Sequence, residues 1–179
     1  MTTNNNTMRN IRVEKVTLNV GAGKDQARLE KGVALLKYLT GIPPVKTVTQ
    51  KRIPTWGLRP GLPIGCKITL RGSHAVEFLK KALTAKEGVL SPSNFDNSGT
   101  VSFGIPEYID IEGMKYSPEI GTFGFELCVT LTRPGFRVKK RRVKSSPLGK
   151  SHLISKADAM KFLVENFKVR VGDVEAVVV

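Results

Sequence analysis

Five stretches of the chain show the alternation of apolar and polar residues that is typical of β-strands. The strongest is Phe123–Arg133, in which every second residue is apolar, and the same period of two occurs in Val16–Val20 and Ile64–Leu70. Weaker versions occur in Val45–Ile53 and Thr100–Ile105. Because successive side chains of a strand point to opposite faces, each strand has an apolar face and a polar face. The pattern predicts an antiparallel sheet with helices against one face and Phe123–Arg133 as a central strand.

Three further stretches repeat their apolar residues with the period of an amphipathic helix. We predict helices at Asp25–Thr40, Ser73–Lys86 and Ser155–Phe167. Asp25 is a typical N-cap, and Ser155 with Asp158 resembles a capping box. The residues expected on the buried stripes are Leu29, Val33, Leu36, Leu39, Val76, Leu79, Leu83, Ala159, Phe162, Leu163 and Phe167.

The remaining segments are predicted to be a flexible leader and parts of a single domain. Residues 1–9 are polar and predict a flexible leader, and residues 10–179 predict one domain that contains a basic extension at 133–154. Val169–Val171 and Ala176–Val179 are either short edge strands or disordered. The predicted class is therefore α+β, with a long basic loop and a basic arm.

The charge balance indicates the kind of partner. The chain has 29 Lys and Arg against 15 Asp and Glu, a net charge of +14. Such an excess favours a polyanion, with nucleic acid ahead of a membrane surface. The sequence has no apolar run long enough to span a bilayer and no signal peptide at its start. Cys66 and Cys128 lie in predicted strands, which is consistent with free thiols in a reducing compartment such as the cytosol.

The loop between the strands at 45–53 and 64–70 is a candidate RNA-binding element. It places the lone Trp56 beside Gly57 and Arg59, and an exposed aromatic next to arginine suits base stacking and phosphate pairing. Burial of Trp56 at one end of the core is an equally good interpretation. The neighbouring polar and cationic candidates for RNA contact are Lys46, Gln50, Arg52, Lys67 and Arg71.

A second candidate is the run from Arg133 to Lys150, which contains eight cations and meets no acid until Asp158. A charge run is usually a solvated surface and is sometimes a targeting signal. Its density and its Pro and Gly residues favour an extended arm that lies along RNA phosphates. If about six of its cations contact phosphate, the logarithmic salt dependence of binding has a slope of about −5. The candidates are Arg137, Lys139, Lys140, Arg141 and Arg142.

No pattern supports catalysis or a metal site. The turn Gly21–Lys24 follows a strand, but it matches neither a P-loop nor a dinucleotide fingerprint and predicts a simple strand-to-helix turn. His74 and His152 have no companion ligands at zinc-like spacing. The densest carboxylates, Glu107, Asp110, Glu112 and Glu119, favour a solvated acidic surface that could dock a basic protein.

Five segments in order resemble the large-subunit ribosomal protein L-five family, in its archaeal and eukaryotic branch. They are LNVGAGK, LTGIPPVKT, LRPGLPIGCKITLRG, FGIPEYIDIEGMKYSPEIGTFGF and LTRPGFRVKKRR, and they cover most of Ile11–Arg142. The resemblance implies a two-layer sandwich, loosely like an RNA-recognition module, whose antiparallel sheet is backed by helices on one face. It also implies a structural protein, without catalytic activity or cofactor, that binds 5S rRNA in the central protuberance of the large ribosomal subunit in the cytoplasm.

The resemblance assigns contacts to particular positions. The positions that contact 5S rRNA correspond to Asn19, Ile42, Trp56 and Thr69, although Ile42 replaces a glutamine of the family and cannot donate its hydrogen bond. The loop Gly57–Pro63 resembles the family's loop near the elbow of peptidyl-site tRNA, and Ile109–Thr122 resembles the segment that bridges to small-subunit protein S-thirteen. The tRNA candidates are Gly57, Leu58, Arg59, Pro60 and Gly61; the bridge candidates are Asp110, Glu112 and Glu119. Further partners implied are 23S-type rRNA and other large-subunit proteins.

Two other classes of function fit the sequence less well. An enzyme acting on RNA or on a nucleotide needs a general base or a metal, and nucleotide hydrolysis would reveal it. A peripheral membrane protein needs a basic amphipathic helix, whereas the basic run is interrupted by Pro134, Gly135, Pro147 and Gly149. Liposome binding would reveal that second class.

Overall fold

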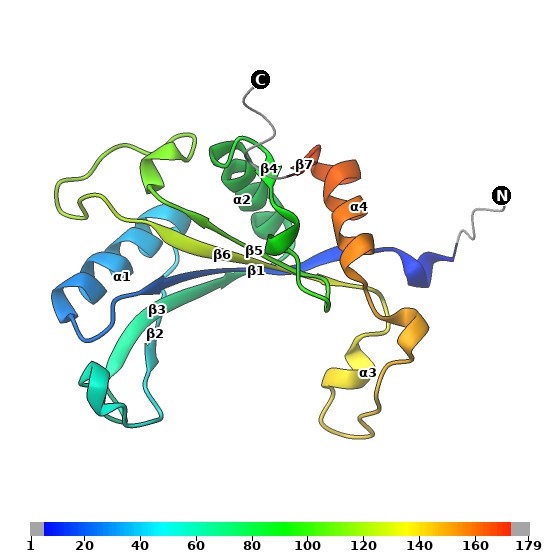
Figure 1. Ribbon diagram of the computed structural model, residues 1–179, viewed down its shortest axis with the longest axis horizontal. Helices are drawn as coiled ribbons and strands as arrows, with labels where there is room; N and C mark the ends of the chain where they lie inside the picture. The colour runs from blue at the N-terminus through cyan, green and yellow to red at the C-terminus, as the bar shows by residue number, and fades with distance from the viewer. Residues whose placement is uncertain (1–5, 173–179) are drawn as a thin grey trace.

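A five-stranded antiparallel sheet forms the centre of the computed structural model, which describes residues 6–172 (Figure 1). The strands lie in the order β2-β3-β1-β6-β5, so that β2 and β5 are the edges. Their bounds are β1 Arg12–Gly21, β2 Val45–Val48, β3 Pro63–Leu70, β5 Thr100–Ile105 and β6 Phe125–Thr132. Two smaller strands, β4 (Val89–Leu90) and β7 (Arg170–Val171), pair in parallel as a separate ribbon.

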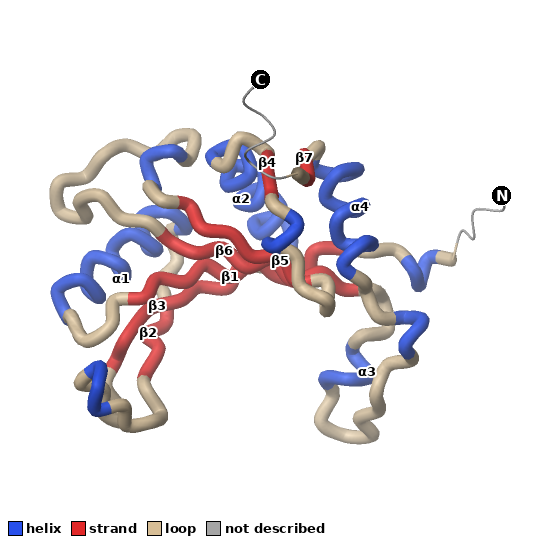
Figure 2. The backbone as a smooth tube through the Cα atoms, in the orientation of Figure 1, coloured by secondary structure: helices blue, strands red, loops and turns tan. Residues whose placement is uncertain are grey.

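Three helices cover one face of this sheet (Figure 2). They are α1 (Gln26–Thr40), α2 (Gly72–Ala85) and α4 (Lys156–Phe167). Every second residue of the sheet faces them, so that Leu18, Leu127 and Val129 have no exposed surface. The α+β class, with helices on one face of an antiparallel sheet, is thus confirmed.

The predicted caps explain where the helices begin. The Asp25 carboxylate accepts hydrogen bonds from the N–H groups of Ala27 and Arg28, and Ser155 and Asp158 form a reciprocal capping box at the start of α4. Burial raises the pKa of Asp158, but hydrogen bonds from Ser155 and the charge of Arg133 outweigh it and leave that pKa below its ordinary value. Gly41 ends α1 with φ of 70°, a conformation that favours glycine.

Several predicted boundaries and stripes were wrong. The strand predicted at Val45–Ile53 ends at Val48, because its register with β3 shifts there and the chain enters a loop at residues 49–62, hereafter the hairpin loop. The strand predicted from Phe123 begins at Phe125. Just before it, Gly124 passes so close to the Pro106 carbonyl that a Cβ there would lie 2.5 Å from its oxygen.

The helical stripes are also shifted slightly from the prediction. Val33 and Val76 are only half-buried, whereas Leu35 and Phe78 are buried. Gly32 faces the sheet as well, where a Cβ would lie 2.9 Å from Val20 Cγ1, so α1 approaches β1 closely at this point. The sequence pattern missed this approach because glycine has no side chain to count as apolar.

The predicted leader and the predicted C-terminal strands lie only partly within the described residues. Thr7–Arg9 form one 3-10 turn, η1, at the end of the predicted leader, while residues 1–5 lie outside the described residues. At the other end, Val171 belongs to β7, and the predicted Ala176–Val179 segment also lies outside the described residues. Between residues 6 and 172, no helix combines the length and apolar character needed to cross a membrane.

Candidate nucleic-acid interface

The face of the sheet opposite the helices, hereafter the open face, has polar side chains in rows across the strands. Asn19 of β1 lies between Lys67 of β3 and Glu126 of β6, and Thr17 lies between Thr69 and Cys128. The same alternation that buries Leu18 and Val20 places these residues on the outside. The residues of the open face are Lys15, Thr17, Asn19, Lys67, Thr69, Ser102, Glu126, Cys128 and Thr130.

Asn19 has a partner within this surface. Its side-chain Nδ2 donates to Glu126 Oε2 at 3.2 Å, so the amide is oriented before any ligand arrives. Cys128 is half-exposed, and burial, together with the nearby carboxylate of Glu126, raises its pKa. The Cys66 thiol, on the helix side, is fully buried and its pKa is raised to about 11 by that burial.

Trp56 is exposed on the hairpin loop. A short 3-10 turn, η2 (Pro54–Trp56), and a bridge between Ile53 and Leu58 fold the loop so that Leu58 points inward and Trp56 outward. The exposed fraction of Trp56 is 66 %, against 7 % for Leu58. The alternative in which Trp56 closes the core is therefore wrong.

The other predicted residues of the hairpin separate into three groups. Gln50, Arg52 and Arg59 are exposed on the loop, together with Gly57, Pro60 and Gly61. Lys67 lies on the open face, and Arg71 is exposed just beyond the end of β3. Lys46 is exposed but pairs in register with Cys66, which faces the helices, so Lys46 projects to the helix side of the edge strand.

The basic arm, residues 133–154, folds back on itself instead of lying extended as predicted. Its one helical turn, α3 (Arg137–Lys140), is followed by a hydrogen bond from Ser146 N–H to the carbonyl of Val138. Proline and glycine stop a long helix but leave room for this single turn. The cations Arg137, Lys139, Lys140, Arg141, Arg142 and Lys144 all remain exposed.

Arg133, the first cation of the basic run, holds the base of the arm together. Its side chain is only 11 % exposed. One guanidinium nitrogen donates to the carbonyls of His152 (3.4 Å) and Leu153 (3.1 Å), and the other donates to Asp158 Oδ2 (3.1 Å). His152 Nε2–H donates in turn to the carbonyl of Pro134 (2.8 Å). The two ends of the arm are thus joined at the start of α4.

The predicted bridge residues lie on a loop at residues 106–124, hereafter the acidic loop. Tyr108 is fully buried within it, and its hydroxyl oxygen accepts from Ser117 N–H at 2.8 Å. Tyr38 of α1 packs edge-on against the Tyr108 ring, which attaches the loop to the helix layer. The carboxylates at positions 110, 112 and 119 are exposed on this folded loop.

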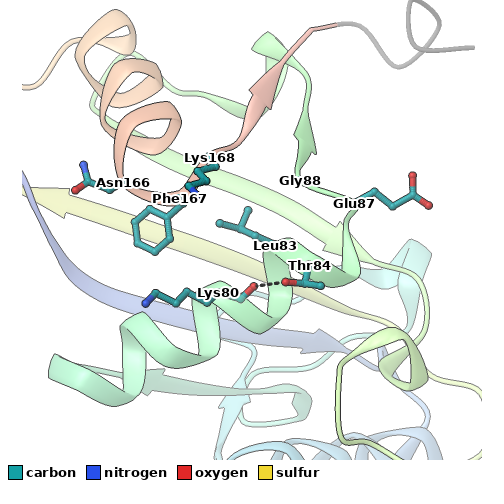
Figure 3. A pocket seen from close by; sticks show the side chains of 8 residues that line it. All are labelled: Lys80, Leu83, Thr84, Glu87, Gly88, Asn166, Phe167 and Lys168. Carbon is teal, nitrogen blue, oxygen red and sulfur yellow. Dashed lines mark hydrogen bonds between the residues drawn. The ribbon is translucent and has the colours of Figure 1, made fainter. Parts of the chain in front are cut away.

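Among residues 6–172, no three His, Cys, Asp or Glu side chains come together to hold a metal ion. A hollow of about 500 Å³ between α2 and α4 contains Thr84, Asn166 and Lys168, but Thr84 donates to the carbonyl of Lys80 in its own helix (Figure 3). Asn166 likewise donates to the carbonyl of Phe162, so both polar side chains are engaged within their own helices.

Two carboxylates of the interface had no signal in the sequence. Glu126 orients Asn19, and Glu14 pairs with Lys140 of the arm and lies 3.8 Å from Arg71. Glu126 stands at a polar position of an alternating strand, which marks it as outward-facing but does not identify its partner. Glu14 lies at the register shift between β1 and β6, where alternation does not predict its direction. Those partners are distant in the chain and come together only in the fold.

Two family models match the chain, and proteins of known family are similar to it over nearly its full length. The model for the C-terminus of the ribosomal L5 protein family matches residues 63–162, and the model for "Ribosomal protein L5" matches residues 6–59. A protein of Sulfurisphaera tokodaii is 49 % identical over 93 % of this chain and 94 % of its own length. A protein of Nanoarchaeum equitans is 50 % identical over 92 % of this chain and 97 % of its own length.

A third relative, from Methanococcus maripaludis, is 43 % identical over 92 % of each chain. All three are described as large ribosomal subunit protein uL5. The family models match most of the described chain, and identity near one half extends over nearly the full length of these relatives. The chain therefore belongs to the ribosomal protein L5 family, a family of structural and non-enzymatic proteins.

Proposed function

We propose that this chain is a structural protein of the large ribosomal subunit that binds 5S rRNA in the central protuberance. One observation carries the proposal: the open face, the hairpin loop and the basic arm all lie on the side away from the helices (Figure 1). The two projections extend from opposite ends of the sheet, and the polar rows lie between them. A folded RNA fits such a surface, because cations at the rim neutralise phosphates while smaller polar groups fix the register.

Within this surface we assign two kinds of contact. Asn19 and Thr69 contact the 5S rRNA from adjacent strands of the open face, and Trp56 stacks on an exposed base. The arm cations, with Lys67 and Arg71, contact phosphates of 5S or 23S-type rRNA. Lys46 is the weakest of the proposed contacts, since it projects to the helix side.

Two further contacts extend the proposal beyond the 5S rRNA. The tip of the hairpin loop, with Arg59 and its flanking glycines, approaches the elbow of peptidyl-site tRNA in the cytoplasmic ribosome. The exposed carboxylates Asp110, Glu112 and Glu119 dock a basic partner, small-subunit protein S-thirteen. These carboxylates are on the acidic loop, at the end of the molecule away from the arm (Figure 1).

Replacement of Trp56 by alanine is expected to weaken binding of isolated 5S rRNA by about 1–3 kcal/mol, because a base loses its stacking partner. Trp56→Phe, which keeps an aromatic ring, is the matched control and retains most of the affinity. A gel shift with a tRNA competitor measures both variants. The melting temperature stays close to that of the unmodified chain, since the side chain is 66 % exposed. An alanine variant that binds as well as the unmodified chain removes Trp56 from the interface.

Bound 5S rRNA is expected to protect Cys128 from alkylation. The thiol is half-exposed on the open face beside Thr17, whereas Cys66 is fully buried, so a small maleimide reacts chiefly with Cys128. The reaction is measured by mass spectrometry at one fixed pH, because the thiolate is the reactive form.

The control for this experiment places a thiol on the helix layer. Glu165→Cys in a Cys128→Ser background puts an exposed cysteine on α4, away from the open face. RNA is expected to slow the alkylation of Cys128 several-fold and to leave the α4 cysteine unaffected. Equal rates at Cys128 with and without saturating RNA would refute the open face as the binding surface.

A further inference from the structure

A small basic hollow lies where the arm meets the sheet. It has a volume of about 240 Å³, and its lining includes Arg12 of β1 together with Arg137 and Lys140 of α3. Arg133 also lines it but donates to the carbonyls and the carboxylate at the base of the arm. Glu14 is the one acid among the residues that line the hollow.

Glu14 is held by cations from two distant segments. It forms an ion pair with Lys140 of the arm, and its Oε1 lies 3.8 Å from an Arg71 nitrogen beyond β3. It lies where the register between β1 and β6 shifts, between Val13 and Lys15. The Glu14 side chain is 18 % exposed, whereas those of Arg71 and Lys140 are 63 % and 53 % exposed. One shielded carboxylate thus occupies the centre of a cluster whose cations reach solvent.

We propose that Glu14 occupies, in the free protein, the place that one RNA phosphate takes in the complex. This inference rests on the proposed RNA binding and adds a defined phosphate site to it. Carboxylate and phosphate oxygens accept from the same lysine and arginine donors. Because the Arg71 and Lys140 side chains are largely exposed, they can turn from Glu14 to a phosphate at the mouth of the hollow, with Arg12 and Arg137 beside it.

A purely structural role for Glu14 fits the contacts less well. The arm is already closed at its base by Arg133 and His152, and internally by the hydrogen bond between Ser146 and Val138. An ion pair with a half-exposed lysine adds little to stability. The main consequence of the Glu14 carboxylate is therefore electrostatic: it neutralises cations that RNA requires and repels an approaching phosphate.

Glu14→Gln tests the inference against 5S rRNA by titration at several salt concentrations. The variant is expected to bind about 2- to 5-fold more tightly, which corresponds to one released ion pair of this kind. The slope of log K against log salt becomes steeper by about 1, since the variant no longer carries a carboxylate charge that offsets one of the phosphate-binding cations. Glu165→Gln is the matched control, because it makes the same charge change at an exposed position of α4.

Two further variants test whether the effect comes from the charge of Glu14 and from its ion pair with Lys140. Glu14→Asp keeps the charge and is expected to bind like the unmodified chain. In a Lys140→Ala background, Glu14→Gln is expected to lose most of its gain, because the released lysine is absent. Far-UV circular dichroism and melting curves confirm that each variant is folded.

The outcomes separate this inference from the function on which it rests. Weaker binding by Glu14→Gln would make Glu14 an anchor of the arm and overturn the phosphate site, as would unchanged affinity and slope. In either case the unmodified chain still binds 5S rRNA, and the proposed function stands. Failure of the unmodified chain to bind that RNA at low salt overturns both.

Discussion

Reversal of four arm charges is expected to reduce RNA affinity more than any other change described above. The variant carries Glu at Lys139, Arg141, Arg142 and Lys144, and retains Lys140 with its partner Glu14. At low salt the dissociation constant for 5S rRNA is expected to rise by roughly 100-fold or more, and the slope of log K against log salt to fall in magnitude by about 3 to 4. Titrations at four or five salt concentrations give both quantities.

The physical reason is the release of counterions. Each lysine or arginine on a phosphate frees about one condensed cation from the RNA, and dilute salt makes that release favourable. The four side chains are exposed on a folded arm, so their replacement changes the charge of the surface and leaves the core untouched. New carboxylates at these positions also repel the phosphates that the arm approaches.

A control variant with the same net charge separates the effect of where the reversed charges lie from the effect of total charge. Lys31, Lys37, Lys81 and Lys161 are exposed on α1, α2 and α4, and their reversal to Glu changes the net charge equally. These residues lie on the helix layer and are expected to reduce the slope far less. If both quadruple variants lose affinity and slope equally, the arm has no special role and the RNA responds only to overall charge.

The alternation of residues was sufficient to predict which way most strand residues face. Leu18 and Leu127 are buried, and Asn19 and Thr69 lie on the open face, because a strand's period of two leaves no other choice once one face is covered. The edge strand β2 illustrates the limit of this rule. Its alternation is weak and its register shifts near Val48, so its length and the helix-side position of Lys46 followed only from the structure.

Contacts between distant residues could not be predicted from the sequence. Arg133 looks like one cation among eight, yet its partners are 19 to 25 positions away and meet it only after the arm folds back. Glu14 lies at a register shift, where simple alternation fails. Trp56 is exposed because Leu58 occupies the inside of the same loop. Nothing in the sequence indicates which of these two apolar residues is the buried one.

Removal of the Arg133 guanidinium is expected to reduce stability more than the other substitutions described above. Arg133→Met keeps much of the side-chain volume but leaves the carbonyls of His152 and Leu153 without the guanidinium donor, and leaves Asp158 with the Ser155 N–H alone. The loss of charge-assisted hydrogen bonds at a largely buried arginine lowers the free energy of unfolding by about 2 to 4 kcal/mol. Chemical denaturation measures this change, and amide hydrogen exchange is expected to show it first in the arm and in the first turn of α4.

The pH dependence of stability distinguishes this network from simple packing. The pKa of Asp158 in the folded chain lies below its ordinary value of 3.8, so the ionised carboxylate contributes stability above that value and loses it as the pH falls through the lowered pKa. Arg133→Met removes part of that lowering, and the variant is expected to lose less stability on acidification than the unmodified chain. Lys168→Met, which removes an exposed cation near the end of α4, is the control and keeps the original acid dependence. Parallel curves for Arg133→Met and the unmodified chain, offset by a constant amount, would mean that Arg133 acts through packing and its carbonyl contacts, without electrostatic coupling to Asp158.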